Sequence, residues 1–467
     1  MTIAEVFELQ KKRRWSNSQS SAEERIQKIR KLKNSILKYE PDLKKAMHMD
    51  FKKPAYEVEL TEIYPTLEEI HLVIKNLKHW MEPQAVATPL ALLGTRSEIH
   101  FEARGHVLVM APWNYPFQLL FIPLISALAA GNTVMLRSSE KVPETNKVMM
   151  KIIEETFSKE DVFIAPNTLE AAEELLKLPF DHIFFTGSTR IGKKVMAAAA
   201  ENLSTVTLEL GGKSPALVMA DGDLNQAVER ITWGKFLNAG QTCVCADYAL
   251  VHESIYEKFC EKLSDRVHQI YGAGEQALTS PDFARVIEDT SWVRLQDLVD
   301  RTVAAGAKSL LARFAMKSEK FLSPTLLGDV SNHHPIMENE IFGPILPILK
   351  FKDLEEALQI IQSRPKPLAL YIFSKSEKIQ NQILCQTSSG GAVINHLIIH
   401  LGNPHLPFGG VGYSGQGSYH GHYGFRTFSH ERSVLHQGFF SIGSLIYPPY
   451  SGWKAKLALK FLRWLVR

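Results

Sequence analysis

Four short apolar stretches in the first half of the chain alternate with segments of helical pattern, and this alternation constrains the fold more than any other feature. The apolar stretches are 106–111, 132–137, 162–164 and 182–186, and the helical segments between them are 116–130, 143–157 and 169–177. Strands that are apolar on both faces are typical of parallel sheets, because crossover helices cover the two faces. We therefore expect an α/β fold built on a covered parallel sheet.

A second alternating region runs from residue 206 to about residue 394. Its candidate strands are 216–219, 248–251, 345–349 and 370–373. Residues 81–95 are rich in Pro and Ala, which indicates a connector. The chain has 467 residues, more than one hydrophobic core usually supports, so we expect two or three domains.

Charge and hydropathy exclude several classes of protein. The formal net charge is +3, and the body of the chain has no arginine-rich patch, so nucleic acid is not an expected partner. Residues 1–50 lack the apolar core of a signal peptide. The longest apolar run, 119–131, is too short to span a bilayer and contains Pro123. We expect a cytoplasmic protein that makes at most peripheral contact with a membrane.

The chain contains four cysteines, which give no disulfide framework and favour a reducing compartment: Cys243, Cys245, Cys260 and Cys385. Cys243 and Cys245 could form half of a metal site, but no second pair completes it, so no metal is expected. Cys243 follows Gly240, Gln241 and Thr242, a flexible polar stretch that suits an accessible nucleophile. Taken alone, the more usual role of such a cysteine is a small buried residue.

A turn rich in small residues, Gly187 to Gly192, joins the apolar stretch 182–186 to the start of a helix. The N–H groups and the positive dipole end of a helix N-terminus can hold a pyrophosphate. The spacing is G-x-x-x-x-G rather than the G-x-G-x-x-G dinucleotide fingerprint, and no Walker-type lysine follows. By itself the turn is a weak signal, since Gly187 could simply cap a turn.

Two further polar residues lie where apolar strands are expected to end. Glu209 stands between two leucines and before two glycines, where desolvation would raise its pKa and make it a usable general base. Asn114 stands between Pro112 and Pro116 after the first strand, a rigid placement that suits an oxyanion donor. The ordinary alternatives are a surface glutamate and a turn asparagine.

Five motifs in order give the chain a resemblance to the aldehyde dehydrogenase superfamily. They are Pro112-Trp113-Asn114, Phe185-Thr186-Gly187-Ser188, Leu208-Glu209-Leu210-Gly211-Gly212, Gly240-Gln241-Thr242-Cys243 and Glu340-Ile341-Phe342-Gly343-Pro344. The segments 366–374 and 406–415 and the sequence Tyr447-Pro448-Pro449 resemble the short class 3 branch, which includes the fatty aldehyde dehydrogenases. The resemblance covers nearly the whole chain.

The resemblance implies a division into three parts and a tail. Residues 1–80 and 99–206 would form a Rossmann-like dinucleotide-binding domain, and residues 207–396 an α/β catalytic domain. Residues 81–98 and 397–452 would form a small bridging element that pairs subunits in a homodimer.

The resemblance also implies a mechanism. Cys243 would attack an aldehyde carbonyl to form a thiohemiacetal, which Asn114 and the Cys243 backbone N–H would stabilise. Loss of hydride to NAD or NADP would leave a thioester, and Glu209 would activate water to release a carboxylic acid. The residues assigned to cofactor binding are Gly187, Ser188, Thr189, Gly192, Arg137, Glu140, Trp113, Glu340 and Phe342.

Two departures from the family pattern leave questions open. The family usually has Lys-Pro-Ser-Glu where this chain has Arg137-Ser138-Ser139-Glu140. Arginine favours a 2′-phosphate and hence NADP, whereas Glu140 favours a free ribose 2′-OH and hence NAD. Cys245 is outside the family motif, and it is either a bystander or a partner for a protective disulfide with Cys243.

Residues 453–467 form a basic, apolar tail. On a helical wheel its cations fall in one stripe, and apolar residues cover most of the remainder; the cations are Lys456, Lys460, Arg463 and Arg467. This composition is typical of an interfacial membrane helix, but a tail packed on a partner subunit or over the substrate entrance fits equally well. About 20 residues are needed to span a bilayer, so the tail is too short to do so.

The leading hypothesis is oxidation of apolar aldehydes, with medium or long aliphatic chains or aromatic rings, to carboxylic acids. One rival is a CoA-acylating or reductive relative, and Glu209 counts against it. A rival of another class is a cysteine hydrolase or acyltransferase without a nucleotide, which would leave Glu340 and the Gly187 turn unexplained. A silent binding protein would not need Cys243.

Overall fold

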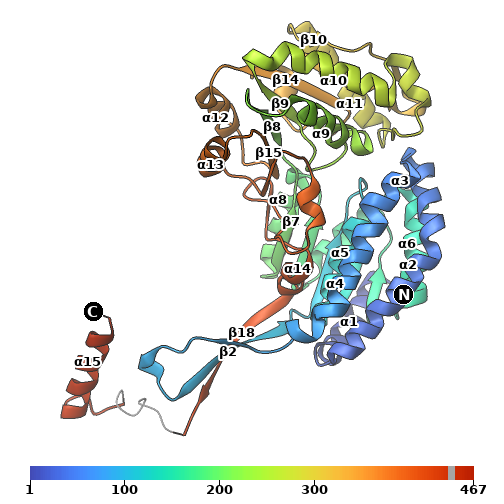
Figure 1. Cartoon of the computed structure of the whole chain (residues 1–467). Helices are drawn as coiled ribbons and strands as arrows, with labels where there is room; N and C mark the ends of the chain where they lie inside the picture. The colour runs from blue at the N-terminus through green and yellow to red at the C-terminus, as the bar shows by residue number, and fades with distance from the viewer. Residues whose placement is uncertain (440–446, 467) are drawn as a thin grey trace.

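The computed structural model describes residues 1–439 and 447–466. It consists of two bodies, each built on a mostly parallel sheet, and a long arm that projects from the first body (Figure 1). Residues 440–446 of the predicted bridging element, and Arg467 of the tail, lie outside the described residues. The structure confirms the predicted α/β class with Rossmann-like parallel sheets.

The first body contains a six-stranded sheet in the order β17-β7-β6-β3-β4-β5. All neighbours are parallel except the short β17, which runs antiparallel to β7. The strands are β3 (His106–Met110), β4 (Thr133–Arg137), β5 (Val162–Ile164), β6 (His182–Thr186), β7 (Thr205–Glu209) and β17 (Gly415–Gln416). Every residue of β3 and β6 is buried, which explains their continuous apolar sequences.

Helices cover this sheet and connect its strands. They are α1 (Ile3–Ser18), α2 (Ala22–Phe51), α4 (Tyr64–Trp80), α5 (Gln118–Ala130), α6 (Pro143–Thr156), α7 (Leu169–Lys177) and α8 (Thr189–Glu201). The α5 helix corresponds to the longest apolar run, and all of its residues from Leu119 onward are buried. The α2 helix packs on α4, α5 and α6. No helix of the described residues is long and apolar enough to cross a membrane.

Between α2 and α4 the chain forms a short helix, α3 (Ala55–Val58), that continues into one turn of π-helix, Glu59–Ile63. The i→i+5 bonding of a π-helix is rare and often marks functional sites. Here the π-helical turn shifts the register of the helical run formed by α3, the turn and α4. Glu57 of α3 and Glu62 of the turn are both buried.

The second body contains a seven-stranded sheet in the order β10-β13-β14-β9-β8-β15-β16, parallel except for β10. Its strands are β8 (Pro215–Val218), β9 (Tyr248–His252), β10 (Lys308–Ser309), β13 (Thr325–Gly328), β14 (Ile345–Phe351), β15 (Ala369–Phe373) and β16 (Gly391–Ile394). The longer helices around it are α9 (Leu224–Phe236), α10 (Tyr256–Tyr271), α11 (Asp289–Ala304), α12 (Leu354–Gln362) and α13 (Glu377–Gln386).

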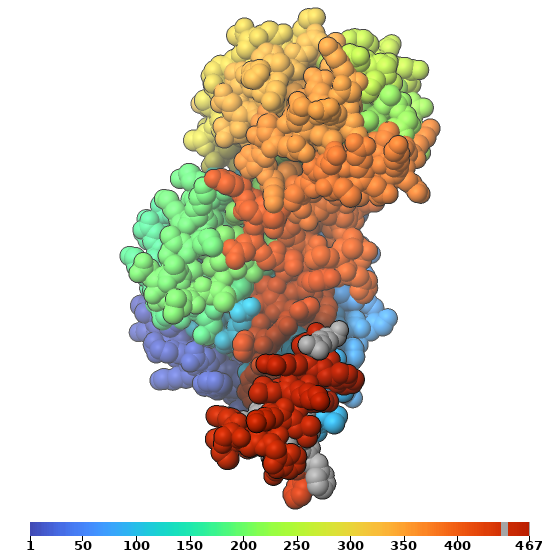
Figure 2. All heavy atoms as spheres, turned by 90° about the vertical axis from the view of Figure 1, so that its left-hand side faces the viewer, coloured from blue at the N-terminus to red at the C-terminus, as the bar shows by residue number. Residues whose placement is uncertain are grey.

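The arm is a three-stranded antiparallel sheet of β1 (Gln84–Val86), β2 (Thr95–Ala103) and β18 (Ser429–Gln437). The β2 and β18 strands pair over nine residues, from Thr95 with Gln437 to Ala103 with Ser429. The tail forms α15 (Trp453–Leu465) beside the far end of the arm, where it contacts the turn Leu90–Leu92 (Figures 1 and 2).

Two strands cross the domain limits predicted from the sequence, and two elements of the predicted bridging segment belong to the first body. The β7 strand runs through the limit at 206/207, and β2 extends past residue 98. Residues 415–416, within the predicted bridging segment 397–452, form β17 of the first sheet. The helix α14 (Gly421–Thr427) of the same segment packs on α4 and α5. That segment therefore contributes to the first body as well as to the arm.

Candidate active site

The predicted catalytic residues come from separate elements that meet between the two bodies. Asn114 lies in the turn after β3, and Glu209 ends β7. Cys243 lies in the turn between α9 and β9. The carboxyl ends of parallel strands are where α/β folds place their binding sites. The charge of Glu209 acts on the thiol of Cys243, so these two side chains are electrostatic neighbours.

A left-handed turn leads into Cys243. Three successive residues have positive φ: Asn238 at 52°, Ala239 at 52° and Gly240 at 69°. A Cβ at position 240 would collide with the carbonyl oxygen of Gly343, so the close approach requires glycine. Non-glycine residues in this region are strained and persist where surrounding contacts hold them.

Hydrogen bonds tie this turn to Asn114. The Asn238 amide donates to the Asn114 carbonyl oxygen at 2.9 Å, and the Asn114 amide donates to the Gln241 carbonyl oxygen at 3.0 Å. Gln241 is fully buried, and its own amide donates to the carbonyl of Arg285 at 2.9 Å. An asparagine amide has two N–H groups, so Asn114 keeps one for another acceptor.

The surroundings of Cys243 disfavour the negatively charged thiolate form of its side chain. Burial raises its pKa first, and the negative charges of Glu340 and Glu209 raise it further. The side chain still keeps partial exposure and lines a cavity. At neutral pH the group is therefore a thiol, and its use as a nucleophile needs a nearby base.

Glu209 has the properties of such a base. It is 3% exposed, and neither carboxylate oxygen has a hydrogen-bond partner among the described residues. Burial alone raises the pKa of Glu209 well above its usual value. A carboxylate that is desolvated and unpaired takes up protons readily, which is what a general base must do.

Glu340 and Phe342 approach the same region from the loop before β14. The Glu340 carboxylate lies against Gly211 and accepts the backbone N–H of Gly212. Burial, followed by the charge of Asp247, raises the pKa of Glu340 to about 8. Phe342 meets Trp113 edge to face, with ring centroids 5.5 Å apart. The structure thus brings together two residues predicted from motifs 229 positions apart, Trp113 and Phe342.

The predicted phosphate turn follows β6 and opens α8. Ser188 is the N-cap residue, and its side chain accepts the Ile191 N–H. A Cβ on Gly187 would come 2.5 Å from the Phe185 ring, so the turn must present bare backbone. Thr189 is tied to the Tyr413 carbonyl at 3.0 Å. The first N–H groups of a helix have no intrahelical partner, and a pyrophosphate could accept them.

Arg137 and Glu140, the two residues predicted to face the adenosine ribose, bind each other. Their Nη2 and Oε2 atoms are 2.7 Å apart. The Arg137 Nε is buried and has no hydrogen-bond partner among the described residues, whereas the Glu140 side chain is 52% exposed. The residues at this position and in the Gly187 turn therefore fit a dinucleotide, and the arginine can exchange its partner for a phosphate.

Sequence reasoning missed a buried charged cluster behind the catalytic turns. Lys53 is fully buried, pairs with Glu62 at 2.8 Å, and lies 3.9 Å from the Tyr115 ring centroid. Glu62 accepts the N–H groups of Phe117 and Gln118 at 3.2 and 2.8 Å. In sequence, these residues look like the polar face of an amphipathic helix, and a π-helical turn has no sequence signal that would reveal otherwise.

Glu57 is the member of this cluster that reaches the second body. Its Oε2 accepts the Asn238 N–H at 3.0 Å, at the start of the left-handed turn. Burial raises the pKa of Glu57 to about 7, although Lys53 opposes the shift. One helical run therefore supports both the Asn114 turn, through Glu62, and the Cys243 turn, through Glu57. We call Lys53, Glu57 and Glu62 the buried clamp.

Cys245, the second cysteine of the motif region, is buried beside a lysine. The fully buried Lys235 directs its Nζ at the Cys245 sulfur, 3.8 Å away, and that thiol faces the Gly240 carbonyl at 3.4 Å. All four cysteines are free thiols. Burial raises the pKa of Cys245 to about 11.

A cavity of about 380 Å³ opens in front of Cys243. Most of its wall is apolar, and the wall comes from both bodies and from the segment 398–420; it includes Leu60, Tyr64, Leu119, Ile122, Trp233, Leu237, Ile398, Leu401 and Phe408. The sequence does not reveal this set, because its members come from distant positions without a shared pattern.

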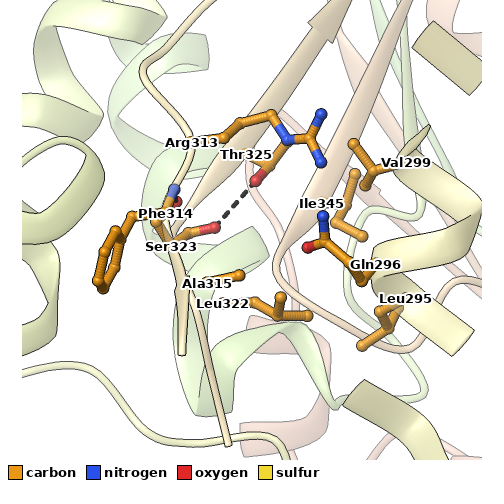
Figure 3. A pocket seen from close by; sticks show the side chains of 10 residues that line it. All are labelled: Leu295, Gln296, Val299, Arg313, Phe314, Ala315, Leu322, Ser323, Thr325 and Ile345. Atoms are coloured by element: carbon orange, nitrogen blue, oxygen red, sulfur yellow. Dashed lines mark hydrogen bonds between the residues drawn. The ribbon is translucent and has the colours of Figure 1, made fainter. Parts of the chain in front are cut away.

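A smaller cavity, of about 230 Å³, lies in the second body between α11 and the sheet (Figure 3). Its wall is formed by Leu295, Gln296, Val299, Arg313, Phe314, Ala315, Leu322, Ser323, Thr325 and Ile345. Arg313 is paired with Asp300 at 2.6 Å. These residues differ from those around Cys243, so this cavity is separate from the candidate site.

Known proteins resemble this chain along most of its length. The model of the aldehyde dehydrogenase family matches residues 5–434. The 4,4′-diaponeurosporen-aldehyde dehydrogenase of Staphylococcus aureus is 44% identical over 428 residues, which are 92% of each chain. A dimeric, NADP-preferring aldehyde dehydrogenase of Rattus norvegicus is 42% identical over 420 residues, 90% of this chain and 91% of that protein.

Two further similarities concern the branch and the structure. Aldehyde dehydrogenase family 3 member A2 of Rattus norvegicus is 39% identical over 440 residues, 94% of this chain and 90% of that protein, which agrees with the predicted branch. A solved structure titled as the substrate-bound state of Staphylococcus aureus AldH covers 99% of this chain and all of its own, with a TM-score of 0.94 and 41% identity. The chain therefore belongs to the aldehyde dehydrogenase family of oxidoreductases, as its motifs predict.

Proposed function

We propose that this enzyme oxidises apolar aldehydes to carboxylic acids with NAD or NADP. The observation that carries the proposal is the position of Cys243 in an apolar cavity next to the desolvated, unpaired carboxylate of Glu209. A hydrolase or acyltransferase would need neither the Gly187 turn nor Arg137 and the Glu340 loop.

The chain's own groups supply the acid–base and covalent steps. Glu209 takes the Cys243 proton, and the sulfur adds to the aldehyde carbon to form a thiohemiacetal. The Asn114 amide and the Cys243 N–H stabilise the negative oxygen. A bound nicotinamide would supply the acceptor for the hydride of this carbon, and loss of the hydride leaves a thioester on Cys243. Glu209 gives the thiol proton to solvent and then removes a proton from the water that attacks the thioester. This proton returns to the Cys243 sulfur as the C–S bond breaks and the acid is released.

For the dinucleotide, Ser188 and the first N–H groups of α8 would hold the pyrophosphate, Arg137 and Glu140 the adenosine ribose, and Glu340 the nicotinamide ribose. The exposed Glu140 can turn away and leave Arg137 for a 2′-phosphate, or accept a bond from a 2′-OH. Use of both NAD and NADP follows from this pair, and one related enzyme is named as NADP-preferring.

The cavity wall favours aldehydes with long or bulky apolar groups. Burial of apolar substrate surface contributes about 25 cal/mol per Å², so a longer chain should lower the Michaelis constant until the cavity of about 380 Å³ is filled. One relative is named as a 4,4′-diaponeurosporen-aldehyde dehydrogenase.

The experiment is a panel of short, medium, long and aromatic aldehydes, each assayed with NAD and with NADP. We expect reduced nucleotide and free acid in equal amounts, with kcat/KM rising with chain length. Product analysis in the presence of CoA separates hydrolysis from acyl transfer. Formation of an acyl-CoA instead of acid, or turnover without nucleotide, would overturn the proposal.

We further propose that the enzyme is a homodimer with peripheral membrane contact. The β18 strand is the edge strand of the arm: it pairs with β2 on one side, and most of its residues are exposed. Its other edge could pair with a second copy of the chain, and a related enzyme is named as dimeric. The α15 helix presents Trp453, Leu457 and Trp464 to solvent beside basic residues. Sedimentation equilibrium tests the dimer, and a monomer at micromolar concentration would contradict it.

A further inference from the structure

The arm gathers two histidines and a glutamate on one face. Glu98 and His100 are two residues apart on β2, so their side chains share a face of the sheet. His436 lies on β18 opposite Arg96, diagonal to Glu98. The pairing of β2 with β18 over nine residues holds these positions in a fixed register.

The three ligand atoms converge on one point. The Nε2 of His100 is 3.2 Å from the Glu98 Oε2, and the Nε2 of His436 is 3.1 Å from that same oxygen. All three atoms lie within 4.8 Å of one another. A tetrahedral zinc ion with bonds of about 2.0–2.1 Å separates its ligand atoms by roughly 3.3 Å. The atoms are therefore spaced for a shared metal with little movement of the side chains.

The neighbouring arginines bind other carboxylate oxygens and do not contact the Glu98 oxygen that the two imidazoles share. Arg96 lies 3.3 Å from the other Glu98 oxygen, Oε1, so it does not occupy the face where the imidazoles meet. Arg432, opposite His100, is turned to Glu102 at 2.6 Å. The Glu98 side chain is 13% exposed, whereas those of His100 and His436 are 34% and 46% exposed. A metal here would keep one position open to water.

We propose that Glu98, His100 and His436 form a binding site for a divalent zinc-class ion that joins β2 to β18. Two imidazoles and one carboxylate are a ligand set that zinc uses in proteins, with water as the fourth ligand. The ion would link residues 338 positions apart in the sequence, within the arm that projects from the first body (Figure 1). The site is independent of the proposed aldehyde chemistry.

The test uses the full-length protein without a histidine tag, titrated with Zn²⁺ and, for its visible spectrum, with Co²⁺. We expect one ion per chain at this site and a tetrahedral cobalt spectrum without a thiolate charge-transfer band. That band would report binding to one of the four free cysteines instead. Because the ion displaces protons from its ligands, affinity should fall as the pH is lowered.

The variants His436→Ala, His100→Ala and Glu98→Gln should each weaken binding by at least about tenfold, since even residues behind the ligands contribute 10–100-fold. His430→Ala is the matched control, because His430 is an exposed residue of the same face of β18. The absence of saturable zinc binding, or equal binding by wild type and the three variants, would show that the cluster is a hydrogen-bonded ion pair only and would overturn the proposal.

Discussion

The environment of Cys243 sets the order of proton transfers at the site. Its thiol is buried near two carboxylates, which raise its pKa, while Glu209 is buried without a partner and is a strong proton acceptor. A thiol with a raised pKa becomes a nucleophile only when a nearby base accepts its proton. The same glutamate is then in place for the water that attacks the thioester, so one carboxylate serves both halves of the reaction.

Replacing Cys243 by Ala should abolish aldehyde oxidation, because no other thiol lines the cavity in the described residues. Nucleotide binding, measured by fluorescence quenching or calorimetry, should persist because the Gly187 turn and Glu340 are untouched. Cys385→Ala is the control, since Cys385 is exposed on α13. Turnover of Cys243→Ala at the wild-type rate would refute the nucleophile assignment.

Replacing Glu209 by Gln should slow turnover by about 10²–10⁴-fold, the usual contribution of a general base. At high pH, hydroxide in solution can take the Cys243 proton in place of Glu209, whereas attack of water on the thioester still lacks its base. Acyl-enzyme should therefore accumulate at high pH and be visible by mass spectrometry of the intact protein. The sign of the pH dependence follows from the raised pKa: the carboxyl is protonated and inactive at low pH, so kcat of the wild type rises with pH through that pKa. In Glu209→Gln this limb should disappear; its persistence would assign the base elsewhere.

The residues that act on substrate could be predicted because each stands in a short motif. Cys243, Glu209 and Asn114 were identified in this way, and their roles stay predictions that these variants test. The buried positions of Glu57 and Glu62 could not be predicted, because a buried glutamate on a helix has the same sequence pattern as a solvated one. Only the packing of α3 against the turn at Asn238 shows that the Glu57 carboxylate points inward.

Among the elements, the helical run that carries the π-helical turn and the buried clamp connects the two bodies. The clamp accepts backbone N–H groups from the first body at Phe117 and Gln118, and from the second body at Asn238. Eight strands were predictable as continuous apolar stretches: β3, β4, β5 and β6 of the first sheet and β8, β9, β14 and β15 of the second. The strands β10, β13, β16 and β17 were not predicted; β10 is exposed and β16 is only partly buried. The arm strand β18 was not predicted as a strand, because eight of its nine residues are partly or fully exposed and show no alternation.

Replacing Glu57 by Ala should leave the Asn238 N–H buried without its acceptor, which costs about 1–3 kcal/mol. If the left-handed turn relaxes, Asn114 and Cys243 shift, and kcat/KM should fall by roughly 5- to 150-fold, the equivalent of that free energy. Glu57→Gln keeps an oxygen acceptor and should recover much of the rate. Glu59→Ala, on the same helical run but at a surface pair with Lys44, is the control.

A purely structural role of Glu57 would lower the free energy of unfolding without affecting kcat/KM of the folded enzyme. Chemical denaturation alongside kinetics separates the two possibilities. Equal losses of activity in Glu57→Ala and Glu59→Ala would contradict a positioning role for the clamp.

At the scale of the whole molecule, the arm carries α15 far from the cavity. The helix contacts the turn Leu90–Leu92 and buries Ala458, so the tail of this chain does not cover the substrate entrance in the described structure. Trp453, Leu457, Leu459 and Trp464 remain more than half exposed, at 71%, 54%, 55% and 68%. An exposed apolar surface of this kind marks a site of contact with a protein or a membrane. The neighbouring Lys456 and Lys460 favour a negatively charged membrane surface.

Deletion of residues 453–467 should therefore reduce binding to vesicles that contain anionic lipid. Each Lys or Arg near such a surface contributes about 1 kcal/mol, so loss of the tail's cations and tryptophans should weaken binding by well over tenfold. The double variant Lys456→Glu, Lys460→Glu keeps the apolar face and isolates the electrostatic part, and raised salt should mimic it for the wild type. Activity on a short, water-soluble aldehyde should stay unchanged and shows that the truncated enzyme is folded. The prediction is wrong if vesicle binding is equal with and without the tail. If the deletion then lowers the dimer fraction in sedimentation, the apolar face of α15 is a contact between subunits and not a membrane surface.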